Sequence, residues 1–272
     1  MSVIHPRNFN DVISGVALAA GAANVIMQLS MPGIGHGVAE SKVDSGNVTK
    51  HPFKRMRTTF TYLAVAAYGS DTEKLAYRKA VNAAHRQVRS TEDSPVDYNA
   101  FDTGLQLWVA ACLYKGSEDV HNALYPRARY RGQNGLYEMS RVLGTTLQMR
   151  EEQWPKTRDD FQTYWDEQLT KVHIDDRVRE YLMQLVDLTM LPAPIAFATR
   201  PFHRFLTTGF LEPAFRKQMH LSWSRADQRA FDLLFSSIGM FNRHLPTPVR
   251  AFPLNAYLYD FRQRVRSGKA LV

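Results

Sequence analysis

The sequence has almost no cysteine, since Cys112 is the only one among 272 residues. This count excludes a disulfide framework, a Cys-x-x-Cys metal site and an iron–sulfur cluster held by cysteines. A chain without disulfides fits a reducing compartment, and we expect a cytoplasmic protein. Cys112 shares a helical stripe with Leu105 and Trp108, where a small buried thiol is expected rather than a nucleophile.

Acidic residues are scarce relative to basic ones. The chain has 26 Asp and Glu against 34 Lys and Arg, which gives a formal net charge of +8. Such a charge suits nucleic acid, an anionic membrane surface or acidic groups on a ligand. The basic residues are spread along the chain and accompany no nucleic-acid motif. We therefore predict no nucleic-acid partner and rank charge-driven surface binding last among the possible functions.

Alternating strand patterns are nearly missing, and almost every apolar segment repeats at three to four residues. We predict an all-α fold in which one large multi-helix domain covers residues 1–272. Helices are expected near residues 8–30, 53–68, 71–89, 102–114, 117–125, 135–152, 158–171, 175–190, 225–241 and 247–266. Loops are expected where proline and glycine cluster, near residues 32–52, 91–100, 192–201 and 245–253.

One long apolar run, residues 12–31, raises the question of a signal peptide or a membrane span. Arg7 is the only full positive charge ahead of it, and Asn24, Gln28 and several small residues interrupt it. These features are typical of a tightly packed core helix rather than a lipid-facing one. We predict no integral membrane span.

Several motifs that carry chemistry are missing. The glycines at 33, 35 and 37 follow no predicted strand, and Val38 stands where a dinucleotide fingerprint needs its third glycine. The chain has no Walker loop, no His-Glu-x-x-His and no Gly-x-Ser-x-Gly. A single Glu118-x-x-His121 occurs, whereas di-iron carboxylate bundles need two copies. We therefore expect Glu118 to favour the helix dipole and His121 to be solvated, and di-iron chemistry is a distant alternative.

His85 is the one histidine set well inside a strongly patterned helix. Ser70 and Glu73 form a capping-box start, and Tyr77, Val81 and Val88 mark the apolar stripe that contains His85. A neutral imidazole there either hydrogen-bonds to a neighbour, which is the commoner case, or gives its lone pair to a metal. One internal ligand is what a haem with an open distal side needs, and a chain with 15 Phe, 12 Tyr and 10 Met can line such a cavity.

Ordered segments along the chain carry a resemblance to a known family. They are residues 28–33, 51–62, 68–69, 84–89, 98–108, 158–165, 192–194, 206–211 and 259–262. Together they resemble the latex-clearing protein (rubber oxygenase) and MpaB-type oxygenase family. The resemblance implies an all-helical protein with a globin-like core and extra helices that enclose a pocket for haem b. It also implies an oxygenase or oxidase that uses dioxygen on a hydrophobic small molecule, isoprenoid-like or aromatic.

The same resemblance assigns residues. His85 matches the family's proximal ligand to the haem iron, and Arg55 and Thr59 match its Arg-x-x-x-Thr motif near the haem. In such a pocket Arg55 would pair with a propionate or hold a polar distal network, and the Thr59 hydroxyl would orient oxygen or water. Glu40, in the glycine-bearing segment before Arg55, is a candidate distal base. The plainer alternatives are a surface cation for Arg55, a hydroxyl bonded to its own helix for Thr59 and a solvated carboxylate for Glu40.

The chain also departs from the family pattern at three positions. Thr58 stands where the rubber-cleaving members carry a distal lysine, so a lysine-capped resting state is not expected. Ala110 replaces a histidine found in many relatives, and Arg89 replaces a family glycine. An alternative function is therefore a non-catalytic carrier or sensor that holds haem or a lipid-like ligand without turnover.

Overall fold

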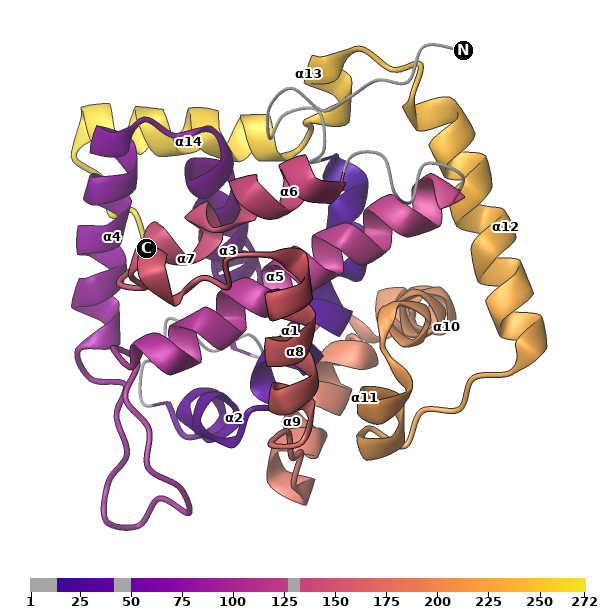
Figure 1. The fold of residues 1–272 in the computed structure, drawn as a ribbon, viewed down its shortest axis with the longest axis horizontal. Helices are drawn as coiled ribbons and strands as arrows, with labels where there is room; N and C mark the ends of the chain where they lie inside the picture. The colour runs from indigo at the N-terminus through magenta and orange to yellow at the C-terminus, as the bar shows by residue number, and fades with distance from the viewer. Residues whose placement is uncertain (1–13, 42–49, 127–132) are drawn as a thin grey trace.

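The structure is a computed structural model that describes residues 14–41, 50–126 and 133–272. Within these ranges the secondary structure is helical, and the only β pairing is an isolated bridge between Arg89 and Asn99 (Figure 1). The prediction of an all-α fold is confirmed. The part of the predicted first helix that precedes residue 14 lies outside the described residues.

Helix α5 (Thr103–Leu124) runs diagonally through the centre of the molecule (Figure 1). Asp102 caps its start by accepting hydrogen bonds from the backbone N–H groups of Gly104 and Leu105. Around it pack η2 (Gly15–Ala20), α1 (Gly21–Leu29), α6 (Gln133–Ser140), α7 (Val142–Thr145) and α12 (Arg225–Asn242). The core includes Trp108, which stacks on Trp165 of α8 (Arg158–Leu169) at 4.9 Å between ring centroids.

Two helices were expected where α5 is continuous. The break predicted at residues 115 and 116 is wrong, because Gly116 lies inside the helix. A Cβ added at Gly116 would lie 2.4 Å from the Nδ2 atom of Asn24. That amide in turn donates a hydrogen bond of 2.6 Å to the carbonyl of Cys112. Gly116 is therefore a close-packing position between α1 and α5, not a helix end.

Helices α1 and α2 (Pro32–Ala39) meet at a sharp bend. No single described helix has the length and apolar character to cross a membrane. The segments Gly15–Leu29 and Pro32–Ala39 have that length and composition only when taken together, and they are bent by 107° relative to each other. The prediction of a loop over residues 32–52 is wrong for α2. Its glycines allow close packing: a Cβ at Gly35 would lie 2.5 Å from the carbonyl oxygen of Leu29.

Helices α3 (Pro52–Tyr68) and α4 (Asp71–His85) form a hairpin around Gly69 and Ser70. The expected capping box is present, with Ser70 and Glu73 each bonded to the other's backbone N–H. Helix α4 ends at His85, four residues before the predicted end. Helix α14 (Leu254–Ser267) packs along α3 and closes the hairpin from one side (Figure 1).

The second half of the chain contains further helices, and two of them were not predicted. The further helices are α9 (Asp176–Val186), α10 (Ala193–Phe210), α11 (Pro213–Gln218) and α13 (Thr247–Arg250). The two that were not predicted are α10 and α11. Proline at residues 192, 194 and 201 predicted a loop, but Pro194 sits in the first turn of α10, where it is tolerated. The predicted helix over 135–152 divides into α6, α7 and η5 (Glu151–Gln153), and that over 247–266 into α13 and α14.

Candidate functional site

The α3–α4 hairpin brings His85 and Arg55 together. Because α4 folds back along α3, its last turn lies beside the first turn of α3. About one turn from Arg55 along α3 and two turns from His85 along α4, the Tyr77 hydroxyl donates a hydrogen bond of 2.6 Å to the Thr58 carbonyl and so ties the two helices. Besides burial, the positive charge of Arg55 lowers the pKa of the His85 ring, so these two predicted site residues lie near each other although 30 positions separate them in the sequence.

The His85 side chain is half-buried and has no hydrogen-bond partner within the described part of the chain. Its Nδ1 atom is fully buried and unpaired. Burial, and then the positive charge of Arg55, lower the pKa of His85 from 6.5 to about 4. The ring is therefore neutral at pH 7 and keeps a lone pair for a ligand. It does not make the hydrogen bonds that a satisfied core histidine would make.

Arg55 and Thr59 lie on the same side of α3. Arg55 is exposed and makes no ion pair with any described residue. Thr59 is partly buried, and its hydroxyl has no partner in the described ranges. Thr58 differs, because its hydroxyl donates a hydrogen bond of 2.9 Å to the carbonyl of Arg55. The threonine bonded to its own helix is thus Thr58, and the Thr59 hydroxyl is available to a ligand.

Glu40 belongs to a separate polar cluster at the end of α2. Its carboxylate accepts hydrogen bonds from Ser94 at 2.9 Å, Tyr98 at 3.1 Å and Arg177 at 3.2 Å, and lies 3.1 Å from Nδ1 of His36. Burial would raise the pKa of Glu40, but these hydrogen bonds and the Arg177 charge together lower it. None of these partners is Arg55, Thr59 or His85. Glu40 is an ionised, well-held carboxylate rather than a solvated one.

His36 joins this cluster to α9, a contact that sequence reasoning missed. The ring is buried, and its Nε2 atom lies 2.7 Å from Asp175, the residue that caps α9. Both ring nitrogens therefore face carboxylates, so the ring links the end of α2 to the start of α9. The sequence places His36 among glycines, which predicted a loop. The i, i+4 spacing of His36 and Glu40 is the signal that could have indicated a helix.

Glu118 and His121 do not form part of a metal site in the described residues. Glu118 is buried and accepts hydrogen bonds from the Tyr114 hydroxyl, at 2.8 Å, and from Arg158. His121 is partly buried rather than solvated, with its ring 5.2 Å from that of Tyr125. No group of three or more His, Cys, Asp and Glu is placed to bind a metal ion anywhere in the described ranges. A metal held by His85 would therefore need ligands other than side chains of that kind.

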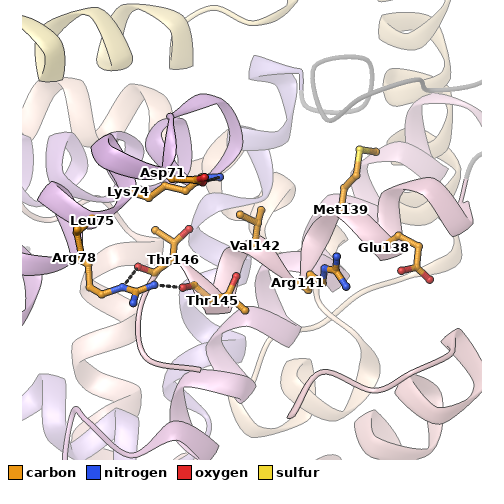
Figure 2. A pocket seen from close by; sticks show the side chains of 10 residues that line it. All are labelled: Asp71, Lys74, Leu75, Arg78, Glu138, Met139, Arg141, Val142, Thr145 and Thr146. Atoms are coloured by element: carbon orange, nitrogen blue, oxygen red, sulfur yellow. Dashed lines mark hydrogen bonds and ion pairs between the residues drawn. The ribbon is translucent and has the colours of Figure 1, made fainter. Parts of the chain in front are cut away.

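A hollow of about 650 Å³ opens elsewhere, between α4 and the α6–α7 segment (Figure 2). Arg78 lines one end of it and donates hydrogen bonds to the carbonyl oxygens of Thr145 and Thr146. Its lining is mixed, with Asp71, Lys74, Glu138 and apolar groups. None of the sequence-predicted site residues lines this hollow. The expected pocket for haem beside His85 stays a prediction.

The groups at the hairpin are nevertheless of the kinds that a haem would use. A buried imidazole nitrogen without a partner is costly unless a ligand orders the ring, and a neutral imidazole is the form that binds iron. Arg55 supplies a positive charge with no carboxylate partner in the described part of the chain, as a propionate would require. Thr59 adds a free hydroxyl. These three groups come from adjacent turns of two packed helices.

Fold and site together define a class of protein: an all-α protein with a neutral histidine that has no hydrogen-bond partner among the described residues and lies within reach of an arginine charge. Comparison with known families makes this specific. The chain belongs to the family described as ER-bound oxygenase mpaB/B'/Rubber oxygenase, catalytic domain, which matches residues 11–240. The family predicted from sequence is confirmed, and with it a role as an oxidoreductase that acts with dioxygen on a small molecule.

Two bacterial relatives cover nearly all of the chain. An uncharacterized protein of Mycobacterium bovis and one of Mycobacterium tuberculosis are each 50% identical to it over 251 residues. The alignment spans 92% of this chain and 98% of each relative. No solved structure matches the chain.

Proposed function

We propose that the protein is a haem b-dependent oxygenase that uses dioxygen on a hydrophobic small molecule, isoprenoid-like or aromatic, with His85 as the axial ligand to iron. The observation that carries the proposal is the His85 ring, which is half-buried, neutral at pH 7 and without a hydrogen-bond partner in the described chain. A ring in this state is poised to donate its lone pair to a metal. Family membership supplies the oxygenase chemistry.

Arg55 and Thr59 are proposed to act beside His85. Arg55 would hold a haem propionate or a polar ligand by charge-assisted hydrogen bonds, since no described carboxylate neutralises it. The Thr59 hydroxyl would orient oxygen or a water molecule. Haem, when bound, supplies the one-electron and dioxygen chemistry that no side chain here provides. The protein's own contribution would be a neutral ligand and a nearby positive charge.

Glu40 is proposed as a proton acceptor for the reaction. Its lowered pKa keeps it ionised at pH 7, and the Ser94 and Tyr98 hydroxyls hold its Oε2 atom in place. A carboxylate held in this way can take a proton only when substrate or a water molecule replaces one of its present partners. The role is thus conditional on substrate binding near α2.

The decisive test is the absorption spectrum of the purified full chain, with pyridine haemochrome analysis for haem b. We expect a Soret band in the wild type and its loss or shift in His85→Ala. His121→Ala is the matched control, because His121 is also partly buried with a burial-lowered pKa yet stands on another helix. A colourless wild type that takes up no added haemin would refute the proposal.

Oxygen consumption then separates an enzyme from a carrier or sensor. Ferrous protein is incubated with isoprenoid, terpenoid and aromatic candidates in an oxygen electrode. Substrate-dependent uptake that disappears in His85→Ala supports the oxygenase. Binding of carbon monoxide without oxygen uptake on any candidate would favour the non-catalytic alternative.

A further inference from the structure

The first half of α10 stands apart from the rest of the fold in its exposure. Ile195, Phe197 and Phe202 are 51%, 75% and 58% exposed. Ile195 and Phe202 lie two turns apart on one side of the helix, whereas Phe197 points to the opposite side. Ala196 apart, residues 192–202 are exposed all round the helix. An apolar helix of this kind is normally covered on every side.

The second half of α10 anchors the helix to the protein. Thr207, Thr208 and Phe210 are buried, and the Phe210 ring lies 4.8 Å from the rings of Phe231 and Phe235 on α12. Exposed apolar residues on α12, in contrast, accompany a buried face on the same helix. The first half of α10 is therefore an apolar projection with a fixed base.

The charges on this projection have one sign. Residues 188–211 contain no Asp or Glu, whereas Arg200 and Arg204 lie within them. Arg204 is paired with Asp187 at 3.3 Å, and Arg200 makes no ion pair with a described residue. The whole chain has a formal net charge of +8. Such a surface is attracted to anionic groups, and residues 193–202 themselves carry no carboxylate that would repel them.

The start of α10 is also unusually free of unpaired backbone donors. Pro192 and Pro194 have no N–H group, and the N–H of Ile195 donates to the Pro192 carbonyl at 2.9 Å. Of the first-turn groups only the Ala193 N–H has no partner among the described residues. Unpaired N–H groups are the main cost of placing a helix end in an apolar medium, and here that cost is small.

We propose that the first half of α10 inserts into the interface of an anionic lipid bilayer and docks the protein on it. A flat protein partner would cover one side of the helix, but lipid surrounds an inserted element and covers Ile195, Phe197 and Phe202 together. Residues 193–202 span about 15 Å, enough for a tilted helix to enter the headgroup and upper acyl region. The Arg200 guanidinium then lies among lipid phosphates.

Flotation of the full chain with vesicles tests the proposal. One set of vesicles is phosphatidylcholine alone, and the other also contains phosphatidylglycerol. We expect binding to the anionic vesicles that weakens with salt. Phe197→Ser with Phe202→Ser should lower the partition constant at least about 100-fold, because two phenyl groups lose their apolar burial. Leu233→Ser with Phe241→Ser on α12, at 69% and 72% exposure, is the matched control and should change it less than about twofold.

Quenching of tryptophan fluorescence measures insertion of the helix into lipid, and a separate measurement excludes misfolding of the variants. Phe197→Trp should be quenched by brominated lipid, whereas Phe241→Trp should not be. Circular dichroism checks that each variant is folded. The proposal is overturned if the wild type ignores anionic vesicles or if the α10 and α12 pairs lose binding equally. A solution dimer that only the α10 pair dissociates would assign the surface to a second copy instead. Haem content plays no part in these measurements, so the outcome is independent of His85.

Discussion

At the scale of single residues, the partners of a histidine distinguish its role better than its place in a helix. His36 and His85 both lie in helices, yet His36 has a carboxylate at each ring nitrogen and His85 has no partner in the described chain. The first ring holds α2 against α9. The second is left for a ligand, and burial together with the Arg55 charge keeps it neutral.

Thr58 and Thr59 offer a matched test of whether the Thr59 hydroxyl orients oxygen or water. Thr59→Val removes a hydroxyl that no described residue uses, so we expect unchanged stability and at least about tenfold slower oxygen consumption in the loaded protein. Thr58→Val removes the bond to the Arg55 carbonyl and should cost at most about 1 kcal/mol of stability with nearly normal turnover. Thermal unfolding and the oxygen electrode measure both. Equal loss of turnover in the two variants would contradict the assignment.

Glu40 should make stability depend on acid pH. Its pKa in the folded protein lies below the usual 4.5, so the unfolded chain binds the proton first as pH falls. The stabilisation is therefore complete above about pH 5 and is lost as pH falls through the folded pKa. Glu40→Gln should cost about 1–3 kcal/mol at pH 7, and its unfolding curve should approach that of the wild type in acid. Urea unfolding at several pH values checks this, and a constant gap between the two proteins would count against it.

At the scale of helices, those that begin with a polar capping residue were predictable from the sequence. Helices that contain glycine or proline and depend on close packing were not. The capping box at Ser70 is present where the sequence predicts it, and Thr157 and Ser224 begin α8 and α12 with the same motif. Their signal is local, because side chain and backbone donor are three residues apart. Helices α2 and α10 lack such a signal. Their glycines and prolines indicate loops unless the distant chain that packs against them is known.

Gly116 gives a quantitative test of that argument. Gly116→Ala should destabilise the protein by about 1–3 kcal/mol, although alanine favours helix, because the new Cβ would meet the Asn24 amide that already bonds the Cys112 carbonyl. Gly21→Ala is the control: nothing lies within 4 Å of the Cβ position there, and stability should hold or rise by up to about 1 kcal/mol. Midpoints of urea unfolding compare the two. Similar stability of both variants would show that α1 and α5 can separate.

At the scale of the whole molecule, contacts within the site can be predicted from the sequence only where the chain folds back on itself locally. Two helices joined at Gly69 and Ser70 must bring Arg55 close to His85, so this pair was within reach of sequence reasoning. Glu40 and Arg177 are 137 positions apart, and their contact depends on how α2 and α9 meet. For the same reason the long-range partners of Glu40 were not predictable. The cavity between α4 and the α6–α7 segment depends on tertiary packing in the same way.

Helix α14 supports the site from beyond the part of the chain that the family match covers, which ends at residue 240. Phe261 is fully buried, and its ring lies 5.9 Å from that of Tyr77, the residue whose hydroxyl bonds the Thr58 carbonyl. Phe261→Ala should cost about 3–5 kcal/mol and weaken haem retention, because Tyr77 then loses the packing that fixes α4 on α3. Tyr259→Ala, on the same helix but 65% exposed, should change neither. Urea unfolding and haem transfer to apomyoglobin measure the two effects. Normal haem retention in folded Phe261→Ala would mean that the hairpin holds its geometry without α14.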